Sequence, residues 1–242
     1  MTYETIIFEK KGGVATMTLN RPDQKNAISP QMSAEIDDVL DQTHADEEIV
    51  VLIVTGGTET FCSGMDLKAG WGRSGRRAST IFSIIEGVAA FEKPTIAAVS
   101  GYALGGGLEL ALACDLRVAS DKALFGFPEI NFGATAAAGG PQRLPRLIGT
   151  ANAKQMLFTG ERFDAQEAYR MGLVNKVVPV ESLIEEASKI GELLASKELR
   201  ALKLVKRYVD DGMQMDLTSS LQYTTTVRVT RTTALAEQKS QQ

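Results

Sequence analysis

The sequence predicts an α/β fold in which helices connect parallel strands by crossovers. Three features predict it. The β-branched run 49–55 (IVVLIVT) ends in two glycines, which is typical of a strand buried in a parallel sheet. A second buried run, 95–100 (TIAAVS), follows a helical stretch near residues 78–91. After residue 139 the pattern becomes mainly helical, with one β interruption.

The elements follow one another in order along the chain. Residues 5–8 and 14–19 form a predicted hairpin, and a helix begins at Pro30 with Ser29 as its N-cap. Further predicted elements are a helix at 109–114, strands at 116–119, 124–125 and 173–178, and helices at 151–158, 165–170, 182–195, 199–209 and 217–234. We expect a sheet-containing core over residues 1–180 and a helical region over residues 181–242.

Composition narrows the class of protein. The 242 residues are 44% apolar and 23% charged, as in ordinary globular domains. The net charge is −4 and no run of five like charges occurs, which argues against nucleic-acid binding. No apolar stretch reaches the roughly 18 residues of a membrane span, and the N-terminus lacks the layout of a secretion signal. We therefore expect a cytoplasmic protein that does not enter a membrane.

The chemistry open to the chain is limited by its single histidine, His44, in an acidic, polar segment. Ser-His-Asp and Cys-His catalysis and histidine-rich metal sites are therefore disfavoured. The cysteines Cys62 and Cys114 match no zinc spacing. Catalysis must then depend on carboxylates, hydroxyls, lysines or backbone groups.

Two glycine-containing turns follow the two buried strands. Residues 105–107 are three consecutive glycines, and Gly64 precedes Met65 in FCSGMDL. The glycines could simply permit tight turns. Alternatively, backbone N–H groups at a helix N-terminus and at Met65 face a negative charge on a ligand, as in an oxyanion hole.

Two glutamates are the candidate acid and base. Glu109 lies at the start of the helix after the glycines, and Glu129 stands between Pro128 and Ile130 among several phenylalanines. Glu129 could be a salt-bridged structural residue. Alternatively, apolar surroundings raise its pKa and suit it to proton transfer near neutral pH. A third segment, Gly70 to Gly75, matches G-x-G-x-x-G, but the preceding strand ends at Thr55, too far away for a dinucleotide site.

Several segments together resemble the crotonase (enoyl-CoA hydratase/isomerase) superfamily in order and spacing. The resemblance covers roughly residues 3–235. It rests on LNRPDQKNAIS, FCSGMDLKAG, KPTIAAVSGYALGGGLELALACDLRVAS, FGFPEINFG, GGPQRLPRLIG and TGERFDAQEAYRMGLVNKVVP.

The resemblance implies a spiral of ββα units followed by a helical C-terminal region that builds homotrimers or homohexamers. It implies an acyl-CoA substrate whose thioester carbonyl is held by the N–H groups of Met65 and Gly106. Glu109 and Glu129 would be the catalytic pair. No cofactor is expected beyond the coenzyme A that the substrate carries. The implied CoA and substrate contacts are Gln24, Lys25, Ala27, Gly64, Asp66, Leu67, Lys68 and Ala137.

The sequence departs from the family pattern near the acyl pocket. Ala137 stands where a glycine is usual, and its methyl narrows the space over the reacting carbons. Phe127 replaces a common glutamine and makes the surroundings of Glu129 more apolar, and Ser100 replaces a common asparagine. The usual acidic and aromatic tail is missing from the end of this sequence. The change at Ala137 bears on which substrate is bound, and the missing tail bears on the contacts with CoA or a neighbouring subunit.

Hydration of an enoyl-CoA double bond is the leading prediction, because both glutamate positions are filled. A double-bond isomerase needs mainly one base, for which Glu129 could suffice. Hydration or hydrolysis of a cyclic acyl-CoA is a further alternative. A non-catalytic scaffold that binds CoA or RNA is disfavoured by the intact glutamate pair and the acidic net charge.

Overall fold

The structure is a computed structural model of the chain, and it describes residues 3–69 and 80–227. A six-stranded sheet with the order β1-β2-β3-β4-β6-β9 forms its centre. β1 (Ile6–Lys11) and β2 (Val14–Leu19) form the predicted antiparallel hairpin. The strands that pair in parallel are β3 (Val51–Thr55), β4 (Thr95–Val99), β6 (Leu116–Ser120) and β9 (Lys176–Val178), with β2 at one end. The α/β fold class is confirmed.

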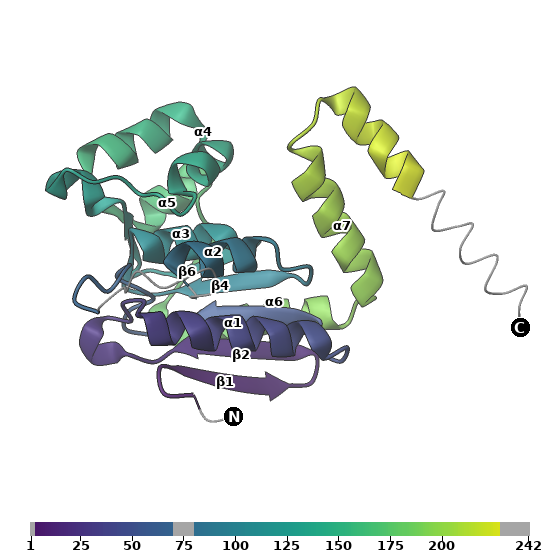
Figure 1. The fold of residues 1–242 in the computed structure, drawn as a ribbon, viewed down its shortest axis with the longest axis horizontal. Coiled ribbons are helices and arrows are strands. Elements are labelled where there is room, and N and C mark those ends of the chain that lie inside the picture. The colour runs from purple at the N-terminus through teal and green to yellow at the C-terminus, as the bar shows by residue number, and fades with distance from the viewer. Residues whose placement is uncertain (1–2, 70–79, 228–242) are drawn as a thin grey trace, which may run out of the picture. The chain divides into compact units, whose positions relative to one another are not determined.

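Helices cover both faces of this sheet (Figure 1). Side chains alternate along β3: Leu52 and Val54 belong to the larger core, which includes residues of α1 (Pro30–Ala45), α2 (Ile81–Ala89) and α3 (Gly106–Ala113). Val51 and Ile53 belong to a second core with α6 (Leu183–Ala195). Burial on both faces explains why β3 and β4 are continuous apolar runs.

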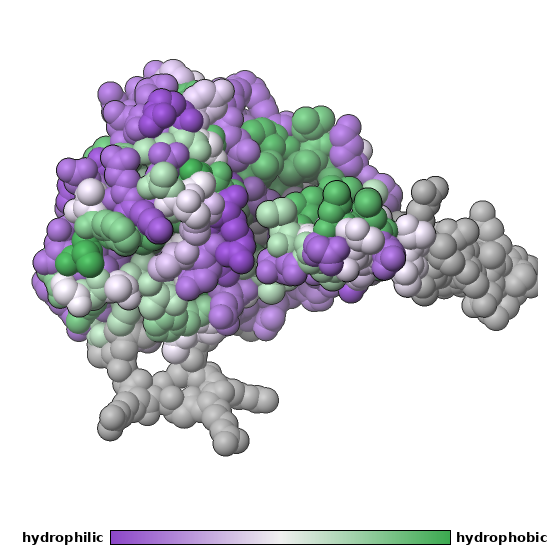
Figure 2. Space-filling view, turned by 90° about the horizontal axis from the view of Figure 1, so that it is seen from above, coloured by the Kyte–Doolittle hydropathy of each residue, from purple (hydrophilic) through white to green (hydrophobic). Residues whose placement is uncertain are grey.

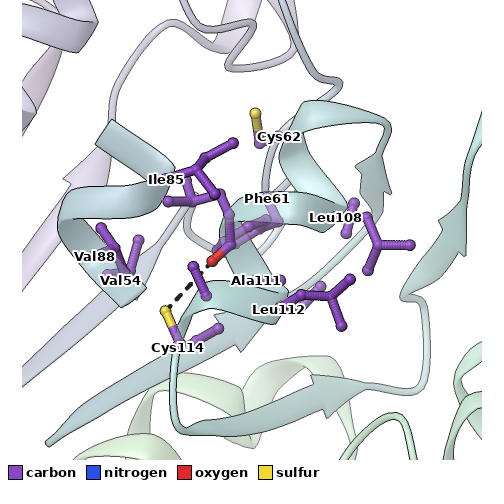
Figure 3. Close-up of a cluster of buried hydrophobic side chains, with 14 of the residues drawn as sticks. Val54, Phe61, Cys62, Ile85, Val88, Leu108, Ala111, Leu112 and Cys114 are labelled. Carbon is purple, nitrogen blue, oxygen red and sulfur yellow. Dashed lines mark hydrogen bonds between the residues drawn. The ribbon is translucent and has the colours of Figure 1, made fainter. Parts of the chain in front are cut away.

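The packing of α2 against α3 fixes the helix that follows the glycines. In Figure 3 the side chains of Ile85 and Val88 of α2 lie in one cluster with Leu108 and Ala111 of α3. Every residue of α3 is buried. A short helix enclosed in this way has a fixed position, and so do the N–H groups at its first turn.

A small second sheet lies at the carboxyl end of β4. It consists of β5 (Tyr102–Leu104), β7 (Leu124–Gly126) and β8 (Phe163–Asp164). The short helices are η1 (Pro22–Gln24), η2 (Pro128–Phe132), η3 (Val180–Ser182) and α5 (Ala165–Met171). η2 follows β7 directly and carries Glu129.

The helix α4 (Gly140–Thr159) is longer than the predicted helix 151–158. Its first half contains Pro145 and ends at Gly149, whose φ of 76° interrupts the helix. Proline and glycine in the sequence therefore hid a helix that begins at Gly140, directly after Gly139 as N-cap. This start matters because it lies beside Glu109.

The chain divides into two compact units, residues 1–197 and 198–242. The first includes α6, which packs on the sheet, so the unit extends beyond the residue 180 at which we expected the core to end. The second contains α7 (Leu199–Gly212), in which no residue is buried, and a helical stretch at 217–227. The rest of the predicted helix 217–234 lies outside the described residues.

Candidate active site

Two backbone segments meet where β4 gives way to the second sheet. On one side of the segment around Met65, the Cys62 N–H donates to the Tyr102 carbonyl at 2.8 Å. On the other side, the Ile28 N–H donates to the Gly64 carbonyl at 2.8 Å. The Met65 nitrogen lies 3.6 Å from the position that a Cβ on Gly106 would take. The segment is therefore held on both sides, next to the first residue of α3.

The N–H groups of Met65 and Gly106 are both available to a ligand. Gly106 is the first residue of α3, so its N–H has no acceptor within the helix. Among the hydrogen bonds of the described residues, none is donated by the Met65 N–H. Two neighbouring free donors can bind one oxygen atom that carries negative charge.

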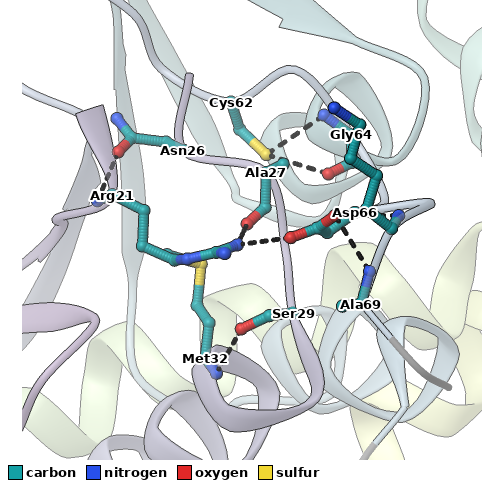
Figure 4. A network of polar contacts seen from close by, with 10 residues as sticks. Arg21, Asn26, Ala27, Ser29, Met32, Cys62, Gly64, Asp66 and Ala69 are labelled. Atoms are coloured by element: carbon teal, nitrogen blue, oxygen red, sulfur yellow. Dashed lines mark hydrogen bonds and ion pairs between the residues drawn. The ribbon is translucent and has the colours of Figure 1, made fainter. Parts of the chain in front are cut away.

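An ion pair connects the segment around Met65 with residues 21–27 (Figure 4). The Arg21 guanidinium donates to the Asp66 carboxylate at 2.9 Å and to the Ala27 carbonyl at 2.5 Å. Burial opposes ionisation of Asp66, but Arg21 and the N–H groups of Lys68 and Ala69 lower its pKa. The pair thus connects residues 21–27 with the residue that follows Met65.

Glu109 points from α3 toward the start of α4. Its side chain is buried, and its Oε1 accepts from the Gly140 N–H at 2.8 Å. Burial raises the pKa of Glu109, whereas the N–H groups of Gly140 and Ala138 and the charge of Arg143 lower it. The result is a raised pKa in a carboxyl that is held at one oxygen.

Glu129 lies against the N-terminus of α3. Its Oε1 is 2.6 Å from the position that a Cβ on Gly105 would take, and its Oε2 is buried without a hydrogen-bond partner. Burial and the charge of Glu109 raise the pKa of Glu129. The two predicted acid/base residues are therefore brought to the same helix N-terminus, which also bears the Gly106 N–H.

Phe127 is the apolar neighbour of both glutamates. It precedes Glu129 by two residues, and its side chain is only 1% exposed. Its ring atoms Cε1 and Cζ lie 2.8 Å from the position of a Cβ on Gly140, the residue that donates to Glu109. The apolar surroundings predicted for Glu129 thus extend to the loop that holds Glu109.

The residues expected to contact CoA lie along two adjacent segments. Residues 24–27 and 64–68 are joined by a parallel bridge between Ile28 and Met65. Gln24, Lys25, Leu67 and Lys68 are exposed, while Ala27 and Asp66 are half-buried and Gly64 is buried. Ala137 is exposed on the loop before α4. Residues 24–27 and 64–68 therefore form a continuous edge beside the Met65 N–H.

The residues that hold Glu109 were not identified from the sequence. Gly140 and Ala138 act through backbone N–H groups, which no side-chain pattern reveals, and Arg143 lies one helical turn away. The Gly-Gly-Pro sequence at 139–141 was the available signal, because proline is favoured in the first turn of a helix. This signal would have predicted a helix N-terminus at residue 140, with free N–H groups close to the glutamate pair.

Other kinds of site find no support within the described residues. No group of three or more potential metal-ligating side chains occurs there, and none of the described helices could span a membrane. Burial raises the pKa of the Cys62 thiol to about 12, so this neighbour of Met65 stays protonated. The glycine motif at Gly70 to Gly75, with Arg73, lies outside the described residues.

Comparison with known proteins identifies the family. The family model described as enoyl-CoA hydratase/isomerase matches residues 9–242, so the chain belongs to this family, within the crotonase superfamily. The crotonyl-CoA hydratase of Syntrophomonas wolfei is 43% identical over 90% of this chain and 85% of its own length. The short-chain-enoyl-CoA hydratase of Clostridium acetobutylicum is 40% identical over 92% and 87%.

Solved structures agree with this assignment. The crystal structure of an enoyl-CoA hydratase from Bacillus anthracis has a TM-score of 0.86 and 41% identity, covering 90% of this chain and 87% of that one. An enoyl-CoA hydratase structure from Mycobacterium tuberculosis has a TM-score of 0.85 and 34% identity, covering 92% and 88%. The crotonase fold that the sequence motifs implied is therefore confirmed.

Proposed function

We propose that this protein adds water across the C2–C3 double bond of an enoyl-CoA thioester. The observation that carries the proposal is the meeting of Glu109 and Glu129 at the N-terminus of α3, beside two free N–H groups. The names of the two relatives support an unsaturated CoA ester as the substrate and favour a short acyl chain.

The N–H groups of Met65 and Gly106 serve as the oxyanion hole. When a nucleophile attacks C3, negative charge passes to the thioester oxygen and an enolate forms. Two fixed donors stabilise that charge without having to reorganise, and the loss of one such donor typically costs about 2.7–4 kcal/mol. The full burial of α3 supports this role, because it fixes the Gly106 N–H.

The two glutamates divide the proton transfers between them. Glu109 takes a proton from water as the water oxygen bonds to C3, and Glu129 gives a proton to C2 on the same face. A second turnover requires a proton to return from Glu109 to Glu129. The N–H donors around Glu109 favour a carboxylate there, whereas the unpartnered Oε2 of Glu129 favours a protonated acid.

The CoA portion lies along the edge formed by Gln24, Lys25, Ala27 and residues 64–68. This edge leads to the Met65 N–H, and Ala137 borders the acyl group from the opposite loop. No metal or nicotinamide takes part, since the acid, the base and the oxyanion donors are all groups of this chain.

The active protein is a homotrimer or homohexamer located in the cytoplasm. α7 has no buried residue, and Val205 and Val209 on it and Met213 at its C-cap are each about 60% exposed. Figure 2 shows hydrophobic side chains gathered in patches on the visible surface. Further copies of the chain would cover such groups. Size-exclusion chromatography with light scattering tests the assembly, and a monomer at working concentration contradicts it.

The decisive experiment measures the consumption of crotonyl-CoA by the wild-type protein and by Glu109→Gln and Glu129→Gln. Each substitution is expected to lower kcat by roughly 10²–10⁴, the usual contribution of a positioned acid or base. Glu86→Gln, on the exposed face of α2, is the control and should leave the rate unchanged. Near-normal rates in either glutamine variant of the pair contradict the assignment.

A panel of substrates separates the alternative activities. A hydratase consumes straight-chain 2-enoyl-CoA esters faster than 3-enoyl-CoA or cyclic esters. Faster consumption of 3-enoyl-CoA would identify an isomerase, and preference for a cyclic ester would identify a ring-specific enzyme. Salt-dependent RNA retention on a filter without any turnover would identify a binding scaffold.

A further inference from the structure

Arg143 occupies a position behind the loop that holds Glu109. It lies in the first turn of α4, and its Nη1 donates to the Ala138 carbonyl at 2.9 Å. Its backbone N–H donates to the Gly139 carbonyl at 2.8 Å. Residues 138 and 139 are thus bound by both the side chain and the main chain of one arginine.

Gly139 shows how closely the guanidinium covers this loop. A Cβ at position 139 would lie 2.8 Å from the Arg143 Cζ and would overlap its Nη1. Gly139 also has φ of 107°, a conformation that residues with a side chain rarely adopt. The loop is therefore shaped so that the planar guanidinium can lie directly on its backbone.

The loop of residues 138–140 also contacts Glu109, the candidate base. The Gly140 N–H donates to the Glu109 Oε1 at 2.8 Å, two residues along the chain from the Ala138 carbonyl that Arg143 holds. The guanidinium is also close enough to Glu109 to favour its ionised form. Glu129 has no cation among the groups that shift its pKa.

We propose that Arg143 is a positioning residue of the hydration reaction: it fixes the 138–140 loop whose Gly140 N–H holds the Glu109 carboxylate. Its positive charge also acts on Glu109 and not on Glu129, which makes the two glutamates unlike, one a base and the other an acid. This inference rests on the proposed function.

Within the part of the chain that the structure describes, few other charges face Glu109. α4, which packs against α3, contributes Arg143, and the charge of Glu109 also acts on Glu129 of η2. The titratable groups of α2 and β5 are Glu86 and Tyr102, and neither shifts the pKa of Glu109. A change of charge at position 143 is therefore expected to shift the pKa of Glu109 with few other charges to offset it.

The test compares Arg143→Gln with Arg143→Lys in the pH dependence of kcat/KM for crotonyl-CoA. Both side chains can donate to the Ala138 carbonyl, but only lysine keeps the charge. Because Glu109 must be ionised, the acidic limb of the profile reports its pKa. We expect this limb to move up by about one pH unit in Arg143→Gln and to stay near the wild-type position in Arg143→Lys.

A purely structural role for Arg143 predicts a different result. Both variants would then lose activity by the same factor at every pH. An acidic limb at the same pH in both variants would overturn the proposal. Arg146→Gln is the matched control, because its guanidinium donates to the Gln142 carbonyl within α4 and not to the 138–140 loop. If Arg143→Gln does not fold, Arg143→Met provides a second neutral variant with the same expected limb.

A readout independent of turnover separates this inference from the proposed function. In a Glu129→Gln background, the carboxyl infrared band that disappears on adding Glu109→Gln belongs to Glu109. Its titration midpoint should rise when Arg143 becomes glutamine, whether or not the protein hydrates crotonyl-CoA. An unchanged midpoint contradicts the inference, whereas an inactive wild-type protein contradicts only the proposed function.

Discussion

The carboxyl of Glu129 lies directly against Gly105, with Oε1 2.6 Å from the position that a Cβ there would take. Any side chain at position 105 must therefore displace the carboxyl. Gly105→Ala is expected to lower kcat for crotonyl-CoA by about 10²-fold or more, since misplacement of a catalytic group by about 1 Å costs that much. Steady-state rates measure the effect.

Backbone strain must be separated from this displacement. Gly105 has φ of 53°, and Gly12 in the β1–β2 turn has φ of 57° but no atom within 4 Å of its Cβ position. Gly12→Ala therefore places an alanine at a similar positive φ without the clash. It should lose about 1–2 kcal/mol of stability and keep its activity. Equal loss of kcat in both variants would show that strain alone accounts for the effect.

Glu129 is expected to destabilise the folded protein at neutral pH. Because burial and the Glu109 charge raise its pKa, the folded state keeps a proton that the unfolded state releases as pH rises. The cost is absent below the unfolded pKa and grows until the folded pKa is passed. Glu129→Gln should therefore raise Tm at pH 8, with the gain vanishing near pH 4.

Calorimetry from pH 4 to pH 8 measures this difference. Glu161→Gln, at an exposed position, is the control and should show no such trend. A gain in Tm that is the same at both ends of the range would mean that the proton on Glu129 is not its cause. Such a trade of stability for a reactive carboxyl is common at active sites.

The sequence predicted those parts of the fold that depend on local pattern. Continuous β-branched runs marked β3 and β4, and Ser29 with Pro30 marked the start of α1, where the Ser29 hydroxyl accepts from the Met32 N–H. The first half of α4 was missed, because its helical residues include Pro145 and end at Gly149. Tertiary contacts with η2 and α3 stabilise this half, and local propensity does not report them.

The candidate site also contains residues that the sequence predicted and supporting groups that it did not. Glu109 and Glu129 stand out because acidic residues are unusual in buried, apolar segments. Their supporting groups do not stand out, since the Gly140 N–H and the Arg143 guanidinium reach Glu109 only after α4 has packed against α3. Which residues belong to the site could be predicted, but which backbone groups hold them required the structure.

Lys93 is expected to stabilise the fold without any part in the reaction. It is 1% exposed, and its Nζ donates to the carbonyls of Thr43 and Asp46 at 2.6 and 2.7 Å, at the C-terminal end of α1. Lys93→Met leaves these buried carbonyls without this donor and should lower the free energy of unfolding by about 2 kcal/mol. Urea denaturation measures the loss.

Activity distinguishes this role from a catalytic one. At a temperature where Lys93→Met remains folded, its kcat for crotonyl-CoA should equal that of the wild type. Lys11→Met, with an exposed side chain, should change neither quantity. A folded Lys93→Met variant with greatly reduced kcat would mean that the end of α1 affects the site.

The ion pair between Arg21 and Asp66 is expected to maintain the oxyanion hole. Asp66 follows Met65 directly, and both charged side chains are largely buried, at 19% and 13% exposed. Without Arg21, the Asp66 carboxylate loses a partner, and the segment that presents the Met65 N–H is less well fixed. Arg21→Met should therefore lower kcat/KM for crotonyl-CoA about tenfold, less than the roughly 10²–10³ that full loss of a donor costs.

A double-mutant cycle shows whether the pair acts as a unit. Asp66→Asn alone should have a similar effect, and Arg21→Met combined with Asp66→Asn should be little worse than either change alone, because residues that share one interaction are not additive. Asp23→Asn, exposed in the same loop, is the control and should leave kcat/KM unchanged. If the two losses multiply instead, Arg21 and Asp66 act separately, and the Met65 N–H does not depend on their contact.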